Sequence, residues 1–227
     1  MQIGFYSILL ILFGYLLGSV PFAYLAGKFY KGKDIRRYGS GTVSGSMVYE
    51  HVARWLIVPV GVLDILKAAF PVWLGLQLNF EPWLAIAAGL AASIGHNWPA
   101  YLGFTGGRGL GTFLGIWLVV YPWGDVWMLA FLAVGWLLGD SAPFALVSLV
   151  VIPIFGYSFG GPAFTLPLSL AMLAITVIKR LEANGRPLPP MNPERRQVLF
   201  LRLIYDRDIK EHKEWLAKQP EGDVSDG

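Results

Sequence analysis

Three glycines around one arginine, Gly106 to Gly109, form the segment of this chain best suited to binding an anion. Glycine lets a backbone approach a ligand closely and point its N–H groups at a phosphate. An apolar, helix-like stretch, Leu110 to Val120, follows at once, so the positive end of a helix dipole would face the same point. The alternative is close helix packing, because glycines recur every four residues from Gly107 to Gly115. Arg108 favours the anion site, since packing gives no reason for a cation there.

A second loop, Asp34 to Ser46, alternates glycines with hydroxyl residues and carries Arg36. Short hydroxyl side chains and free backbone N–H groups suit phosphate oxygens, and an arginine adds charge-assisted hydrogen bonds. A flexible surface loop is the alternative that composition leaves open. His96 lies shortly before the glycine–arginine run, where both a structural role and hydrogen bonding at the site are open. The Walker pattern Gly-x-x-x-x-Gly-Lys-Ser/Thr does not occur, which excludes a P-loop nucleoside triphosphatase.

The composition indicates a membrane protein. Hydrophobic residues make up 55% of the 227 residues and charged residues 15%, against about 25% charged in soluble domains. The charges are segregated, because residues 1–178 hold 14 of the 33 charged side chains and five stretches, 1–27, 82–107, 109–124, 126–139 and 141–178, hold none. A bilayer-spanning helix needs about 20 apolar residues. We therefore expect an all-α polytopic membrane protein with about seven transmembrane helices joined by glycine-rich cytoplasmic loops.

The expected spans follow the apolar stretches, and turn residues separate them. They cover Gly4–Ala26, Trp55–Leu78, Trp83–Tyr101, Leu110–Val120, the short stretch Val126–Gly139, and two segments of 141–178 divided at Gly156–Pro162. Inside the second span, Asp64 and Lys67 lie three residues apart and can pair on one helix face. Charges inside a membrane helix usually face the protein interior, and a structural salt bridge and a functional role are both open for this pair.

The placement of basic residues predicts the orientation of the chain. Outside the expected spans, lysines and arginines occur in residues 28–54, at Arg108 and from Lys179 onward, whereas the alternate turns hold only Glu81 and Asp125 as charged residues. Because basic loops stay in the cytoplasm, we expect the N-terminus outside, the C-terminus in the cytoplasm, and all the candidate loops on one face. We expect a multi-pass protein of the cell inner, or plasma, membrane.

The sequence divides into a membrane domain, residues 1–180, and a C-terminal extension, residues 181–227. The prolines of Arg186–Pro193 exclude regular helix there. Glu194–Lys218 is expected to be helical, with one apolar stripe among many charges. Two interpretations remain: a solvated helix packed on the cytoplasmic loops, or a helix lying on the membrane surface.

Metal and thiol chemistry find little support in the sequence. The chain has no cysteine, so disulfides, haem attachment and thiolate metal sites are excluded. Its three histidines are widely spaced, and we expect no metal site.

Several short motifs occur together in this chain. They are Gly18-Ser19-Val20-Pro21 with Gly27-Lys28, Asp34-Ile35-Arg36 with Gly39-Ser40-Gly41, Asp64 with Lys67, Gly95-His96 with Trp98-Pro99, and Phe104 with Gly106-Gly107-Arg108-Gly109 and Thr112. The set resembles the acyl-phosphate-dependent glycerol-3-phosphate acyltransferase family of bacteria, the PlsY-like proteins. The resemblance covers most of residues 9–180.

The chain departs from the family pattern in its first and third motifs and at one lysine. Thr42 and the segment Ser44–Met47 stand where the family has two asparagines, and Arg108 replaces the glycine-flanked lysine. In the third motif the histidine corresponds to Arg180 and the first asparagine to Ala183, while Arg186 matches the second arginine. The family chain normally ends soon after this motif, whereas this one continues.

The resemblance implies transfer of an acyl chain from acyl phosphate to the 1-hydroxyl of glycerol 3-phosphate, which yields lysophosphatidic acid and phosphate. No cofactor is implied, and the donor's own phosphate serves as proton acceptor in place of a protein base. The resemblance also implies catalytic roles for Ser40, His96 and Arg108. The implied substrate- and phosphate-binding residues are Lys28, Arg36, Gly39, Gly41, Thr42, Ser44, Gly106, Gly107, Gly109, Thr112, Arg180 and Arg186.

The expected partners are acyl phosphate, glycerol 3-phosphate and membrane lipid, with an acyl-phosphate-producing enzyme as a further candidate and no nucleic acid. Two other functions stay open. One is acyl transfer by the same fold to a different acceptor, which the lost asparagines favour. The other is a non-catalytic lipid- or phosphate-binding membrane protein, which the added C-terminal segment favours.

Overall fold

The computed structural model describes residues 2–191, 193–211 and 214–215, which form helices and loops without a strand. The α-helices are α1 (Gln2–Gly18), α2 (Phe22–Lys31), α3 (Gly45–His51), α4 (Ile57–Gln77), α5 (Pro82–Asn97), α6 (Leu110–Val120), α7 (Pro122–Leu137), α8 (Ser141–Ser158), α9 (Thr165–Glu182) and α10 (Pro193–Tyr205). Four short 3-10 turns, η1 (Ile35–Arg37), η2 (Arg54–Leu56), η3 (Ala100–Leu102) and η4 (Ala183–Gly185), lie between them. The all-α class that the composition predicts is confirmed.

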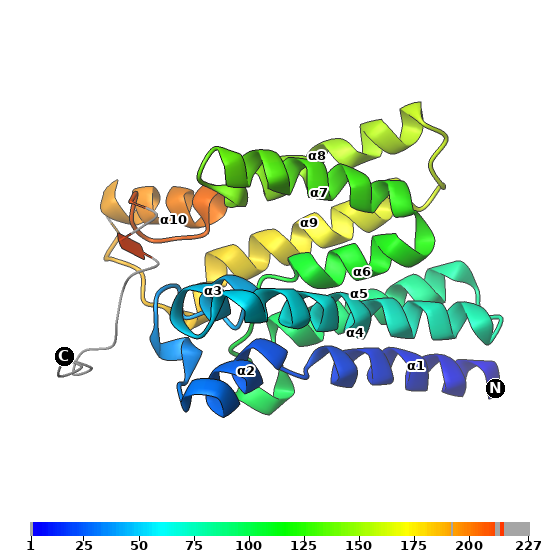
Figure 1. Cartoon of the computed structure of the whole chain (residues 1–227). Helices are drawn as coiled ribbons and strands as arrows, with labels where there is room; N and C mark the ends of the chain where they lie inside the picture. Colours follow the sequence, from blue (N-terminus) through cyan, green and yellow to red (C-terminus); the bar gives the residue numbers. More distant parts are fainter. Residues whose placement is uncertain (1, 192, 212–213, 216–227) are drawn as a thin grey trace.

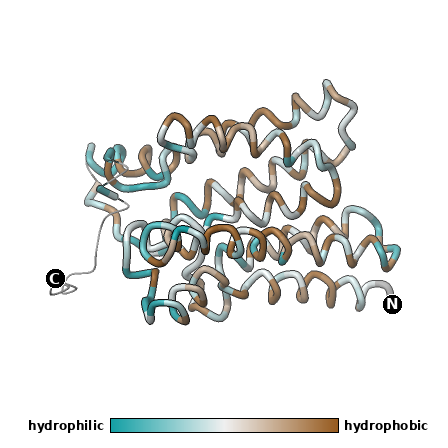
Figure 2. Tube along the Cα trace, in the orientation of Figure 1, coloured by the Kyte–Doolittle hydropathy of each residue, from teal (hydrophilic) through white to brown (hydrophobic). Residues whose placement is uncertain are grey.

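The long helices run along a common direction and form a bundle (Figure 1). Helix α1 packs on α5, α4 packs on both α5 and α6, and α8 packs on both α7 and α9. The short helices α2 and α3, together with α10, gather at one end of the bundle, and the N-terminus lies at the other end. Hydrophilic residues concentrate at the end that carries α3 and α10, as Figure 2 shows.

The interior of the bundle is apolar, and so is much of its outer surface. Phe113, Ile116 and Trp117 of α6 are fully buried in the core. Large apolar side chains are exposed on the outside, among them Leu66 and Trp73 of α4. Apolar surface of this extent marks contact with another apolar phase, which for a bundle of this hydropathy is lipid.

Three described segments are long and apolar enough to cross a membrane, namely Gly4–Lys31, which comprises α1, a break and α2, and the helical segments Arg54–Gln77 and Ser141–Ser158. Helices α6 and α7 are apolar but shorter. The expected total of seven spans therefore stays a prediction.

The first expected helix, Gly4–Ala26, is wrong as a single element, because the chain breaks between α1 and α2. Pro21 has no N–H and disfavours helical backbone at the preceding residue. Ser19 stabilises the break, since its hydroxyl donates to the Tyr15 carbonyl at 2.8 Å and accepts from the Ala100 amide at 3.4 Å. The break turns α2 toward the loops at the end of the bundle (Figure 1).

Other helix boundaries also differ from the expectation. Helix α5 ends at Asn97, not Tyr101, because Pro99 keeps Trp98 out of helical backbone (φ −128°, ψ 69°). Helix α7 begins earlier than expected, with Pro122 in its first turn, where proline is favourable.

The C-terminal extension packs on the bundle. Helix α10 contacts α8 and α9, which supports the interpretation of a packed helix. The alternative of a helix lying on the membrane surface stays a prediction. The expected continuous helix to Lys218 is wrong: α10 ends at Tyr205, because Asp206 adopts a left-handed conformation (φ 57°), and residues 206–211 are not helical, whereas Glu214 and Trp215 are. Residues 212–213 and 216–218 of that expected helix lie outside the described residues.

Candidate functional site

A cavity of about 670 Å³ opens where three segments meet. They are the loop of residues 34–46, called the hydroxyl loop, the loop of residues 106–109, called the glycine–arginine loop, and the C-terminal extension. Its polar lining includes Ser40, Thr42, Ser44, Asp64, His96, Arg108, Asp140, Arg180 and Asp206. Apolar side chains, among them Ile57, Leu110 and Trp136, line it as well. A cavity with both kinds of lining suits a ligand that carries an anionic head and an apolar chain.

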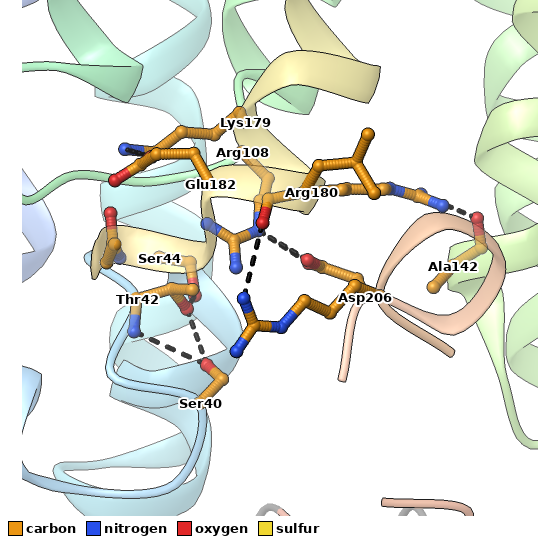
Figure 3. A network of polar contacts seen from close by, with 12 residues as sticks. Ser40, Thr42, Ser44, Arg108, Ala142, Lys179, Arg180, Glu182 and Asp206 are labelled. Carbon is orange, nitrogen blue, oxygen red and sulfur yellow. Dashed lines mark hydrogen bonds and ion pairs between the residues drawn. The ribbon is translucent and has the colours of Figure 1, made fainter. Parts of the chain in front are cut away.

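The hydroxyl loop presents a row of connected oxygens. The Ser40 Oγ lies 2.7 Å from the Thr42 Oγ1, which lies 2.9 Å from the Ser44 Oγ. Ser40 and Thr42 are buried. Figure 3 shows these side chains next to one another, below Arg108 in that view. A hydroxyl can donate or accept, so the row can adapt to a phosphate or a carbonyl oxygen.

The glycine–arginine loop does not form the amide cradle that its sequence predicts. The Gly106 N–H donates to the Asn184 Oδ1 at 3.3 Å, and the Gly107 N–H donates to the His96 carbonyl at 3.0 Å. Two of the three expected amides are therefore already satisfied by the protein. Gly109, in contrast, lines the cavity at the start of α6 with a φ of 78°, so the first turn of α6 supplies N–H groups there.

The glycine repeat serves packing at its later positions. A Cβ on Gly115 would collide with the Ile65 carbonyl of α4, and one on Gly111 would lie 3.1 Å from the Asp64 Cβ. A Cβ on Gly107 would collide with the His96 ring. Helix packing is thus the role of Gly111 and Gly115, while Gly107 lets the loop approach the imidazole.

Arg108 is paired with a residue from the far end of the chain. Its Nε lies 2.6 and 2.7 Å from the two carboxylate oxygens of Asp206. The Arg108 side chain is 10% exposed and that of Asp206 18%. The Nη1 and Nη2 groups of Arg108 are buried and have no hydrogen-bond partner among the described residues.

A buried charge cluster supports the same cavity. The Lys67 Nζ lies 2.9 Å from the Asp64 Oδ1, and the His96 Nδ1 lies 3.5 Å from the same oxygen. Lys67 also donates to the Val20 carbonyl at 3.0 Å. With its Nδ1 toward Asp64, the His96 ring places its Nε2 against Gly107. Asp64 therefore links the salt bridge in α4 to the histidine that lines the cavity.

Asn184 ties the two loops together. Its Nδ2 donates to the carbonyls of Gly41 and Gly106 at 3.2 and 3.1 Å, and its Oδ1 accepts from the Gly106 N–H. Two residues later, the Arg186 Nη1 donates to the Ser40 carbonyl at 2.8 Å. Burial lowers the pKa of Arg186 to about 10, so it stays charged at neutral pH. The segment directly after α9, formed by η4 and Arg186, thus fixes the hydroxyl loop against the glycine–arginine loop.

Several sequence-predicted residues do not reach the cavity. Lys28 is exposed on α2, and Arg36 is paired with Asp34, with its Nη2 2.6 Å from Oδ2. The hydrogen bond from Arg36 lowers the pKa of Asp34. The remaining predicted residues outside the lining are Gly39, Gly41, Gly106, Gly107, Thr112 and Arg186, which shape or support the loops.

Arg180 lines the cavity, but its donors hold the protein together. Its Nη1 donates to the carbonyls of Leu203 and Ile204, at 2.8 and 3.1 Å, and its Nη2 donates to the Ala142 carbonyl at 2.7 Å. These three hydrogen bonds anchor the extension, and the expected phosphate contact of Arg180 stays a prediction. Figure 3 shows the Arg180 side chain extended toward Ala142.

Three site residues, Asp206, Asp140 and Asn184, are not among those predicted from the sequence. Asp206 and Asp140 line the cavity. Asp206 lies beyond the recognised motifs, and no local pattern marks it. Asn184 follows Ala183 directly, so an asparagine lies one residue after the position where the third motif is expected to have lost one.

Comparisons with known proteins agree with this geometry. The family model "Glycerol-3-phosphate acyltransferase" matches residues 8–188. Glycerol-3-phosphate acyltransferase 4 of Dehalococcoides mccartyi (strain CBDB1) is 33% identical over 211 residues, which cover 90% of both chains. The glycerol-3-phosphate acyltransferase of Synechococcus sp. (strain CC9902) is 36% identical over 176 residues, 77% of this chain and 84% of that protein.

Two solved structures share the fold. They are crystal structures of PlsY (YgiH), an integral membrane glycerol 3-phosphate acyltransferase, in a glycerol 3-phosphate form and a lysophosphatidic acid form. Their TM-scores are 0.71 and 0.69 and their sequence identities 28% and 27%, over 80% of this chain and 91% of theirs. This chain is a multi-pass membrane protein and belongs to the glycerol-3-phosphate acyltransferase family, as its motifs predicted.

Proposed function

We propose that this protein transfers an acyl group from acyl phosphate to glycerol 3-phosphate, giving lysophosphatidic acid and inorganic phosphate. The observation that carries the proposal is the shared cavity, in which Arg108 and the hydroxyl row meet apolar side chains. Both substrates carry a phosphate, and one also carries an acyl chain. The family supports the acceptor, and the sequence resemblance supports the donor. An acyl-phosphate-producing enzyme must then supply the donor.

The reaction needs positioning more than a strong base. The 1-hydroxyl oxygen of glycerol 3-phosphate attacks the acyl carbonyl carbon, and the bond from that carbon to the phosphate oxygen breaks. The hydroxyl proton passes to the departing phosphate, so no group on the protein must accept it. Acyl phosphate is an activated anhydride, and holding two anions in line for attack supplies most of the acceleration.

The described residues divide this work. The Arg108 Nη groups and the first turn of α6 neutralise one phosphate. Arg108 lines the cavity and both of its Nη groups lack a partner among the described residues, and Leu110 and Gly111, at the positive end of α6, line the cavity as well. The hydroxyls of Ser40 and Thr42 bind the reacting carbonyl or the second phosphate. His96, held by Asp64, orients the substrate or the loop beside Gly107.

The experiment measures phosphate release from palmitoyl phosphate by the purified protein in lipid, with and without glycerol 3-phosphate. We expect release that requires glycerol 3-phosphate and yields lysophosphatidic acid. Arg108→Ala should lower turnover at least tenfold, since one buried charged hydrogen bond contributes about 1.5–3 kcal/mol. Release without the acceptor, or only with another polyol phosphate, would point to a different acceptor. No release from folded protein would reject the acyl-phosphate reaction.

We also propose that seven spans place the N-terminus outside the cell inner membrane and the loops, C-terminus and extension 181–227 in the cytoplasm. The basic residues of the α2–α3 segment support this orientation. The chain has no cysteine, so single-cysteine variants report sidedness directly. A membrane-impermeant maleimide should label Glu81→Cys in intact cells and should label Lys31→Cys only after lysis. The reverse pattern would contradict the orientation.

A further inference from the structure

The contact between Arg108 and Asp206 joins residues 98 positions apart in the chain. Asp206 lies in the C-terminal extension, beyond residue 188, where the match to the family model ends. Both side chains line the cavity, and Figure 3 shows the Asp206 carboxylate approaching the Arg108 guanidinium. The extension therefore contributes a charged side chain to the site itself.

The backbone that presents Asp206 is firmly held. Arg180 donates to the Leu203 and Ile204 carbonyls, two of the acceptors that the end of a helix leaves without partners. On the far side of Asp206, the Arg207 Nη1 lies 2.5 Å from the Asp140 Oδ2. Anchors before and after Asp206 fix the place of its carboxylate.

The extension has a second ion pair close by. The Arg202 Nε lies 2.6 Å from the Asp208 Oδ1, and Arg202 is 1% exposed. Asp208 also lies 3.2 Å from the Arg186 Nε. The Arg202–Asp208 pair stabilises the turn after α10 without contacting Arg108. Asp208 is therefore a suitable control for Asp206.

The contact with Asp206 engages only the Nε of Arg108 and leaves Nη1 and Nη2 available for a ligand. Both carboxylate oxygens of Asp206 engage Nε, while Nη1 and Nη2 are buried without a partner among the described residues. A guanidinium is planar, so fixing it at Nε also fixes the plane of the two Nη groups. Two buried donors without an acceptor favour the entry of an anion.

We propose that Asp206 is a positioning residue, which holds the Arg108 guanidinium so that Nη1 and Nη2 meet the phosphate of a substrate. This inference rests on the proposed function for the identity of the substrate. Asp206 does not itself touch the substrate, because its carboxylate would repel a phosphate. Lysine at position 108 would keep the charge, but it has no Nε–H that donates to the carboxylate while further N–H groups stay available for a phosphate. The role of Asp206 therefore depends on arginine there.

The test is a double-variant cycle on the full chain in lipid: Asp206→Ala, Arg108→Lys and the two together. We expect Asp206→Ala to raise the KM for one phosphate-bearing substrate about tenfold, while kcat changes about threefold or less. Asp206→Glu should restore most of the loss. In the Arg108→Lys background, Asp206→Ala should change the same KM by less than about twofold.

Asp208→Asn is the matched control, because it removes a carboxylate of the same segment that does not contact Arg108. Its effect on KM should be the same in the wild-type and Arg108→Lys backgrounds. Equal effects of Asp206→Ala in both backgrounds would reduce Asp206 to a structural anchor and overturn the inference. A lower KM in Asp206→Ala would overturn it too, because the carboxylate would then be a competitor for the anion site.

Calorimetric binding of glycerol 3-phosphate and of inorganic phosphate to the same variants separates this inference from the proposed function. If the wild-type protein binds these anions but transfers no acyl group, the proposed function fails. The inference then stands only if Asp206→Ala weakens binding about tenfold in the background that keeps Arg108 and not in the Arg108→Lys background. Unchanged anion binding by the single variant Asp206→Ala would reject the inference.

Discussion

The buried pair of Asp64 and Lys67 makes a prediction that separates stability from function. The side chains are 8% and 2% exposed, and the Lys67 Nζ lies 2.9 Å from the Asp64 Oδ1. At an effective dielectric constant of about 20, this separation gives an attraction of about 6 kcal/mol before desolvation. Removing one partner of a buried pair costs about 3–5 kcal/mol, a factor of about 10²–10⁴ in the folding equilibrium.

We expect Asp64→Leu or Lys67→Met alone to lower the stability of the purified protein by this amount. The two changes together should recover most of it, because replacing a buried pair with apolar groups is often neutral. Acyl transfer should behave differently. His96 loses its carboxylate in both Asp64→Leu and the double variant, so both should stay well below wild-type turnover, by about tenfold.

The assay combines thermal unfolding in detergent with acyl transfer in lipid for all four proteins. A double variant as unstable as the single variants would refute the account of the pair. A stable double variant with wild-type turnover would show that Asp64 does not support His96 and that the pair is purely structural. These outcomes decide between the two interpretations that the sequence leaves open for this pair.

Three smaller predictions follow from single contacts. Gly115→Ala should lower stability by about 1–3 kcal/mol in thermal unfolding, because its Cβ would collide with α4, while Gly4→Ala, with open space around it, should not destabilise the protein. Asn184→Gly keeps the left-handed backbone (φ 56°) but loses three hydrogen bonds, and should lower kcat/KM about tenfold or more while the protein stays folded. Because Arg36 lowers the pKa of Asp34 below 3.8, the pair should stabilise its loop above pH 3.8 and lose this contribution as the pH falls further; Asp34→Asn should abolish that acid dependence of loop proteolysis.

The sequence predicts the class of the fold because its signal is strong and local. Long uncharged stretches specify membrane helices, and the bounds of α4 and α6 agree with the apolar runs to within about two residues. The break at Pro21 and the end of α5 before Pro99 are also visible in the sequence as prolines. A hydropathy pattern underestimates their effect because it does not register a single missing N–H.

The site is predictable only where a motif is contiguous. The hydroxyl loop and the glycine–arginine loop are each one short segment, and the structure brings Ser40, Thr42, Ser44, His96 and Arg108 to one cavity. What the Gly106 and Gly107 amides do is not evident from composition, because their acceptors, Asn184 and the His96 carbonyl, come from other segments. Sequence spacing shows which donors exist and not which are already satisfied.

Two departures from the family pattern become intelligible once the extension is in place. The resemblance assigns a lysine to position 108 and a histidine to position 180, and this chain has arginine at both. Each arginine contacts the extension: the Arg108 Nε donates to the Asp206 carboxylate, and Arg180 donates to carbonyls at the end of α10. Lysine presents a single ammonium, and histidine at most two donors, whereas a guanidinium can hold one partner and still offer further N–H groups. The two substitutions and the added segment therefore act together, and the extension is part of the architecture of the site.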